Sequence, residues 1–158
     1  MILLFSICLV FTQQYQLTDF QRSIICKYEK NIEKQAKSNK LDPALIASVM
    51  FVESSFYPRV VSHAGACGLM QVIPKYTGGP ETRHKKYSCK QLKNPNISIR
   101  VGTQILSYMI YKYAKGNVNQ AICMYNAGTI CLKDKRFYKK LHYVKKVRKH
   151  HEKIINSR

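Results

Sequence analysis

Acidic side chains are scarce in this 158-residue chain, which has 8 Asp and Glu against 27 Lys and Arg. There is none from residue 54 to residue 80, and only Glu81 and Asp134 stand between Glu53 and the basic C-terminal region. Acid–base chemistry in this part of the chain must therefore depend on very few carboxyl groups. The imbalance gives a formal charge of +19, which indicates a polyanionic partner.

Several binding signatures are also missing. No CxxC or Cys/His pair has the spacing of a zinc site, and His150 and His151 lie in a basic tail, so we expect no metal and no cofactor. We expect His63 and the other histidines on the surface or in loops. No helix-turn-helix, zinc finger or aromatic RNA-binding motif is present, so we expect no nucleic-acid partner. The 11 Lys and Arg of residues 133–158 then indicate either adhesion to an anionic wall polymer or membrane surface, or simply a solvated helix.

The N-terminal stretch is apolar but too short to cross a membrane as a helix. Residues 1–11 are apolar except for Ser6 and Cys8, and a polar run follows them. This pattern is typical of the hydrophobic part of a secretory signal, although a basic start and a clear cleavage site are lacking. We predict that residues 1–16 are a signal peptide or membrane leader, with an uncleaved anchor or a buried first helix as alternatives. Residues 17–158 are then a single exported domain, in the periplasm, the cell envelope or outside the cell.

The cysteine content is compatible with export. If Cys8 is removed with the leader, an odd number remains, and the simplest arrangement is two disulfides and one free thiol. The five remaining cysteines are Cys26, Cys67, Cys89, Cys123 and Cys131. Cys67 and Cys89 flank a loop rich in glycine and proline, which makes them a plausible bridge.

Apolar residues recur at helical spacing, and no stretch has a convincing period of two, so we predict an all-α fold. The first predicted helix covers residues 18–38, with an apolar face of Phe20, Ile24, Ile25, Tyr28, Ile32 and Ala36. Later helices are predicted over residues 97–114, 118–125 and 139–155. Residues 58–95 hold most of the glycine and proline, which predicts a loop-rich insertion around a short helix, suited to line a cleft.

A lone carboxylate follows the most apolar segment of the chain. Residues 44–52 are almost wholly apolar, and Asp42 and Pro43 before them are suited to begin a helix, so Glu53 should lie at the end of a buried helix. Desolvation and the negative end of the helix dipole both raise the pKa of a carboxyl group there. Glu53 is therefore our candidate catalytic acid, the alternative being a glutamate that points to water.

Three short segments now stand in order along the chain. They are Glu53-Ser54, residues 65–71 with the sequence GACGLMQ, and residues 121–128 with the sequence AICMYNAG. Together they resemble the catalytic domain of the soluble lytic transglycosylase family, lysozyme-like enzymes that cut the glycan strands of peptidoglycan. Residues 143–147, YVKKV, are similar to the family's closing Y-V-x-K-V segment. Ser98 and Cys67 depart from the family pattern, but neither touches the proposed acid.

The resemblance implies a lysozyme-like fold in which the loop-rich insertion forms a glycan-binding cleft. It implies cleavage between N-acetylmuramic acid and N-acetylglucosamine without water, with Glu53 acting first as acid and then as base, to give anhydromuramyl products. The substrate-binding residues it indicates are Ser54, Met70, Gln71, Tyr125 and Asn126. Tyr125 could orient Glu53 through its hydroxyl. Peptidoglycan is the implied partner, and a secretion, conjugation or phage-entry machine is a further one.

Two alternatives remain open at this point. A goose-type lysozyme would share the helix and the acid but would place water on the anomeric carbon. A non-catalytic, basic wall-binding module would use the same scaffold without chemistry. A degenerate copy of an enzyme is expected to lose its acid, and Glu53 is present, which disfavours the binding module.

Overall fold

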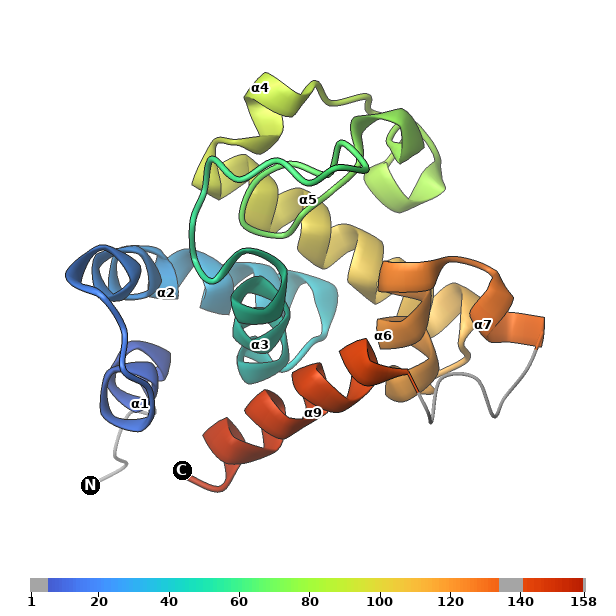
Figure 1. Cartoon of the computed structure of the whole chain (residues 1–158). Helices are drawn as coiled ribbons and strands as arrows, with labels where there is room; N and C mark the ends of the chain where they lie inside the picture. The colour runs from blue at the N-terminus through green and yellow to red at the C-terminus, as the bar shows by residue number, and fades with distance from the viewer. Residues whose placement is uncertain (1–5, 134–140, 158) are drawn as a thin grey trace.

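The computed structural model describes residues 6–133 and 141–157, and within them the chain is helical (Figure 1). The α-helices are α1 (Ile7–Gln14), α2 (Asp19–Asn39), α3 (Pro43–Ser54), α4 (Cys89–Leu92), α5 (Pro95–Tyr108), α6 (Val118–Ala127), α7 (Ile130–Lys133) and α9 (His142–Ile155). Two 3₁₀ turns, η1 (Pro74–Tyr76) and η2 (Pro80–Thr82), lie in the insertion, and a π-helix, η3 (Met109–Tyr113), continues α5. Extended pairing in the described ranges is limited to isolated bridges at Cys67, so the all-α prediction is confirmed.

Helix α3 is the central element, and α1, α2 and α9 pack against it (Figure 1). Asp42 caps its first turn by accepting a hydrogen bond from the Ala44 amide at 2.9 Å, and Pro43 follows, as predicted. Residues 44–50 are all buried, and Ser48, the one polar residue among them, donates its hydroxyl hydrogen to the Ala44 carbonyl, so this part of the helix has no exposed polar face. A helix that is apolar on every side is stable only inside a core, which is the environment that α3 has here.

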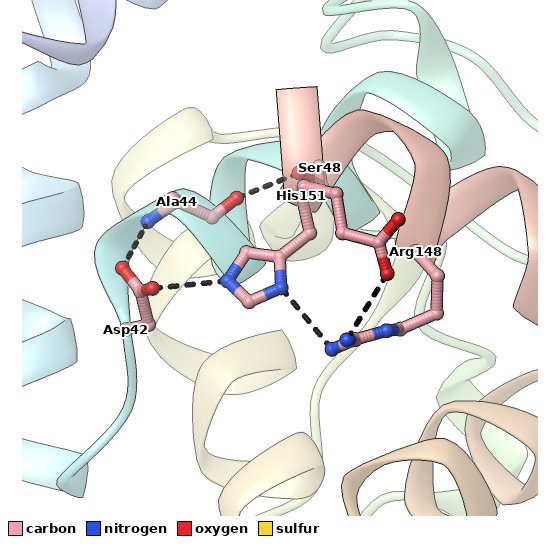
Figure 2. A network of polar contacts seen from close by, with 6 residues as sticks. Asp42, Ala44, Ser48, Arg148 and His151 are labelled. Atoms are coloured by element: carbon pink, nitrogen blue, oxygen red, sulfur yellow. Dashed lines mark hydrogen bonds and ion pairs between the residues drawn. The ribbon is translucent and has the colours of Figure 1, made fainter. Parts of the chain in front are cut away.

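Helix α9 is joined to the start of α3 by a polar network (Figure 2). The ring nitrogen Nε2 of His151 lies 2.9 Å from an Asp42 carboxylate oxygen, and Arg148 contacts the other nitrogen of the same ring at 3.3 Å. Next to it, His150 contacts the hydroxyl of Tyr15 at 2.8 Å and packs edge-on against Phe51. The prediction that these two histidines lie on the surface was wrong, because α9 turns them toward α3 and α1.

Helix α1 is part of the packed structure. Ile7 and Phe11 are both fully buried, and Cys8 forms a disulfide with Cys26 of α2. The far end of α1 meets the C-terminal end of α9, since Gln14 donates a hydrogen bond to the Ser157 hydroxyl at 3.2 Å. No helix in the described ranges has both the length and the apolar character needed to cross a membrane.

The cysteine prediction was half right. Cys67 and Cys89 form the expected bridge, but Cys8 pairs with Cys26, and the remaining two cysteines pair with each other, so none is free in the described chain. The predicted free thiol was wrong because it set Cys8 aside together with the leader.

Some predicted helix limits also differ from the structure. Helix α5 begins earlier than predicted, at Pro95, and gives way to the π-helix after Tyr108. Phe20, predicted for the buried face of α2, is 48% exposed and stacks on Tyr57. The predicted start of the last helix at residue 139 lies outside the described residues.

Candidate active site

Glu53 occupies the last turn of α3, at the opposite end of this helix from Asp42. Its carboxylate accepts a hydrogen bond of 2.6 Å from the hydroxyl of Tyr143, in the first turn of α9. Helices α3 and α9 therefore run antiparallel and are hydrogen-bonded at both ends, because His151 meets Asp42 at the other. This arrangement fixes the distance between Glu53 and Tyr143 through two rigid elements.

The environment of Glu53 controls its protonation. Burial raises the pKa of Glu53 to about 7, while the hydrogen bond from Tyr143 acts in the opposite direction because it stabilises the ionised form. Near neutral pH the carboxyl group is then present in both its protonated and its ionised forms. Such a group can give a proton to one substrate atom and later take one from another.

Two tyrosines stand close to this carboxyl group. Burial, and then the charge of Glu53, raise the pKa values of both Tyr125 and Tyr143 well above their ordinary range, so both stay neutral phenols. Tyr125 donates its hydroxyl hydrogen to the Met70 carbonyl at 2.7 Å. The prediction that Tyr125 orients Glu53 through its hydroxyl was therefore wrong, and Tyr143 occupies that position.

The loop of residues 68–71 is held by three helices through successive backbone groups. Ser54 of α3 hydrogen-bonds to the Leu69 carbonyl at 2.9 Å, and Ser98 of α5 accepts from the Met70 amide at 3.0 Å. Tyr125 of α6 completes the set at the Met70 carbonyl. The loop is thus fixed against the helix that carries Glu53, although nothing in it is regular secondary structure.

The predicted substrate-binding residues have different surroundings. Ser54 is 6% exposed and Met70 is fully buried, which favours a structural role for both side chains. Gln71 has a positive φ of 48° and donates its side-chain amide to the carbonyls of Val60 and Gly68. Asn126 is exposed in the last turn of α6, next to Tyr125. The structure therefore brings Ser54, Met70, Gln71 and Tyr125 together through backbone contacts.

Tyr143 is the residue of the candidate site that sequence reasoning missed. In the sequence it stands out only as the first residue of a segment similar to the family's, and its contact with Glu53 spans 90 residues. Ser98 departs from the family pattern, yet its buried hydroxyl binds the loop. Hydrophobic periodicity carries no information about either contact.

The two acids of the described ranges that could have supplied a second catalytic carboxylate, Glu81 and Asp42, do not lie beside Glu53. Glu81 faces a groove on the far side of α5, and Asp42 is at the other end of α3. Asp134 lies outside the described residues. In the part of the chain that the structure describes, no three side chains of His, Cys, Asp or Glu are grouped as metal ligands would be.

Comparison with known proteins identifies clear sequence similarity. The profile of the transglycosylase SLT domain family matches residues 30–147. The membrane-bound lytic murein transglycosylase C of Actinobacillus pleuropneumoniae serotype 3 is 35% identical over 112 residues, which is 65% of this chain and 31% of that protein. The protein of the same name from Histophilus somni is 37% identical over the same lengths. The chain thus spans about a third of the length of these curated relatives.

Solved structures show the same fold. An inactive mutant of the lytic transglycosylase Slt from Pseudomonas aeruginosa superposes with a TM-score of 0.63 at 22% identity, over 91% of this chain and 25% of that one. The 70 kDa soluble lytic transglycosylase from Escherichia coli gives 0.64 at 21% identity, over 92% and 29%. A complex of a 70 kDa soluble lytic transglycosylase with bulgecin A gives 0.68 at 20% identity, over 94% and 29%. The lysozyme-like architecture predicted from the sequence is therefore confirmed.

Proposed function

The chain belongs to the transglycosylase SLT domain family, and from this we propose that it is a peptidoglycan lytic transglycosylase. The observation that carries the proposal is the partly buried carboxyl group of Glu53, with a pKa of about 7 and a phenol hydroxyl 2.6 Å away. The relatives named lytic murein transglycosylase support the same activity and the same substrate. The bond cleaved is the one between N-acetylmuramic acid and N-acetylglucosamine.

A single carboxyl group suffices for this reaction. Protonated Glu53 donates its proton to the glycosidic oxygen as the bond from that oxygen to the anomeric carbon breaks. The resulting carboxylate takes the proton of the primary hydroxyl of the muramic acid ring, whose oxygen closes on the anomeric carbon. Glu53 is protonated again at the end, no water is consumed, and the new end is anhydromuramyl. The scarcity of acids near Glu53 supports this route over one that needs two carboxylates.

Site residues divide into two groups in this proposal. Asn126 is exposed beside Tyr125 and binds polar substituents of the sugar, because its amide offers both a donor and an acceptor. Ser54, Met70 and Gln71 act as positioning residues, since their polar side-chain or backbone groups are bonded to the protein. The loop-rich insertion forms one wall of the glycan-binding cleft.

Products separate this reaction from hydrolysis. Purified peptidoglycan is digested with the full chain, and the released muropeptides are weighed by mass spectrometry. We expect fragments lighter by one water than the reducing muropeptides. Reducing ends would instead assign the hydrolytic activity of a goose-type lysozyme. An absence of any product from folded, oxidised protein would favour a wall-binding module.

Replacing Tyr143 with Phe should change the pH dependence as well as the rate. The lost hydrogen bond stabilised the ionised form of Glu53, so the pKa of Glu53 rises further above about 7 and the alkaline limb of kcat/KM moves to higher pH. Glu53 also loses the contact that orients its carboxyl group, so kcat falls roughly tenfold. The matched variant Tyr125→Phe keeps the hydrogen bond from Tyr143 to Glu53, so it should leave the alkaline limb of kcat/KM in place. Identical limbs in both variants would contradict the role given to Tyr143.

We propose that the chain acts in the cell envelope or periplasm, and that residues 1–16 direct its export and remain attached afterwards. Three disulfides are typical of oxidising compartments. Loss of the leader would remove Cys8 and leave Cys26 unpaired. The exported protein should therefore show no free thiol on titration under denaturing conditions, and its mass should include Cys8. One free thiol and a shorter chain would contradict retention.

We further propose that the outer face of α9 binds anionic wall polymers. This α9 lysine face consists of Lys145, Lys146, Lys149 and Lys153, all exposed. Such attraction weakens as the Debye length falls from about 8 Å at physiological salt to about 3 Å at 1 M. An accompanying secretion, conjugation or phage-entry machine stays a prediction.

Changing the α9 lysine face to Gln should lower binding to intact wall sacculi roughly tenfold at physiological salt, with little difference at 1 M. Co-sedimentation with sacculi measures this. The matched control removes four exposed charges from α2 instead: Lys27, Lys30, Lys34 and Lys37. An equal loss in both variants would show that only net charge matters, and not the position of α9.

A further inference from the structure

A groove of about 270 Å³ lies between α5, the 3₁₀ turn η2, the π-helix η3 and the end of α2. It is on the far side of α5 from the active site. Ser98 and Gly102, one turn apart on α5, face Met70 in the loop of residues 68–71. Gln104 and Ser107, about 120–180° around the same helix from those two residues at 3.6 residues per turn, line the groove, and Tyr108 lies beside them. No step of the proposed reaction uses this groove.

Two tyrosine rings form the apolar part of the groove. Tyr111 donates its hydroxyl to the Lys40 carbonyl at 2.6 Å and is still 50% exposed, so it is the ring that meets solvent. Tyr108 is held edge-on by the ring of Tyr113, with centroids 5.4 Å apart. Both rings are therefore fixed before any ligand arrives, which reduces the entropy that binding would cost.

Polar side chains with complementary hydrogen-bonding capacity surround these rings. Asn39 and Gln104 carry amides, each with a donor and an acceptor, and Glu81 and Arg83 add an acceptor and a donor fork. A pyranose presents a C–H face that covers an aromatic ring and a rim of hydroxyl and acetamido groups that bind planar polar side chains. Rigid rings bordered by such side chains match this chemistry, whereas an apolar ligand would leave the polar groups unpaired.

We propose that this groove is a second, non-catalytic saccharide site that binds a stretch of N-acetylated glycan. A strand held there keeps the substrate near Glu53 between cleavage events, because a tethered polymer has a high effective concentration. The proposal rests on the proposed function only in naming peptidoglycan as the source of the saccharide. Saccharide binding in the groove is a separate property.

The binding test uses the full-length Glu53→Gln variant titrated with the soluble tetramer of N-acetylglucosamine, followed by the side-chain amide signals of Asn39 and Gln104 in NMR. Both signals should shift, and Tyr111→Ala should weaken this binding at least roughly fivefold. Gln104→Ala, which spares the bond to Lys40, should weaken it too. The control is Phe20→Ala, the loss of an exposed ring on α2, 48% exposed and outside both the groove and the insertion. Unshifted amide signals, or unchanged affinity in Tyr111→Ala and Gln104→Ala, would overturn the proposal. If polyglutamate shifts these amide signals and the tetramer does not, the proposal is also overturned, and the groove is assigned to an acidic peptide.

A rate comparison tests the consequence for the polymer. In the active protein, Tyr111→Ala should lower the ratio of the rate on intact sacculi to the rate on short soluble strands roughly fivefold, while Phe20→Ala keeps the ratio. An unchanged ratio in Tyr111→Ala would contradict the anchoring role. If the unaltered protein cleaves neither substrate but still binds the tetramer in the groove, the proposed function fails and the second site stands.

Discussion

Replacing Glu53 with Gln should abolish muropeptide release, with a loss of roughly three orders of magnitude or more, because one group supplies both proton transfers. The amide is nearly the same size and can still meet Tyr143, so binding and folding should be kept. The measurement is the initial rate of product release from purified peptidoglycan. Glu33→Gln, an exposed acid on α2, is the control for the loss of a negative charge and should keep full activity. Retention of more than a tenth of the rate by Glu53→Gln would remove Glu53 from the mechanism.

The same variant should be more stable than the unaltered protein at alkaline pH. The pKa of Glu53 is raised from its ordinary value to about 7 in the folded state, so between pH 4.5 and about 7 the folded protein holds a proton that the unfolded chain has lost. The stability contributed by this proton is fully present below about pH 4.5 and is lost as pH rises through about 7. Glutamine never ionises, so the difference in melting temperature between the variant and the unaltered protein should grow from pH 5 to pH 8. A constant difference would contradict the raised pKa.

Replacing Gly68 with Ala should give the largest loss of stability, a decrease of about 3 kcal/mol in the free energy of unfolding. Gly68 has a φ of +81°, and an added Cβ would lie 1.9 Å from the Leu92 carbonyl oxygen, which is backbone and cannot turn aside. The loop that starts here carries Met70, to which Ser98 and Tyr125 are bonded. Activity should therefore fall at least roughly tenfold even where the variant remains folded, because small displacements of a site reduce its rate strongly.

Gly65→Ala separates the steric effect from the backbone effect. Gly65 has nearly the same φ, +78°, but a Cβ there would meet nothing within 4 Å. Only the left-handed backbone is then strained, which costs about 1 kcal/mol. Urea unfolding of both variants measures the difference, and peptidoglycan digestion gives the activity. Equal losses of stability would mean that the contact with Leu92 is relieved by movement of the loop.

The parts of the structure that local chemistry determines could be predicted from the sequence. The start of α3 is an example, because Asp42 accepts from an amide two residues away and Pro43 needs no hydrogen bond there. The burial of α3 follows from its almost wholly apolar residues 44–52. Its final carboxylate, Glu53, could therefore be identified as a candidate acid from the residues that precede it.

Contacts between distant segments could not be predicted in this way. Tyr125 and Tyr143 are both tyrosines near the ends of predicted helices, and only the packing of α6 and α9 on α3 decides which one reaches Glu53. The disulfide of Cys8 depends likewise on how α1 packs on α2. The groove behind α5 combines side chains from three regions of the chain, none of which forms a motif by itself.

The meeting of α1 and α9 has a consequence for the order in which the protein can fold. Gln14 and Tyr15 have their partners Ser157 and His150 at the other end of the described chain. Helix α1 must therefore wait for α9, and the side of α1 that packs on α9 stays uncovered until α9 has been synthesised. Contacts of such long sequence separation slow folding. Docking of α9 on α1 is consequently a late step, which the three disulfides, with sequence separations of 18, 22 and 8 residues, can precede.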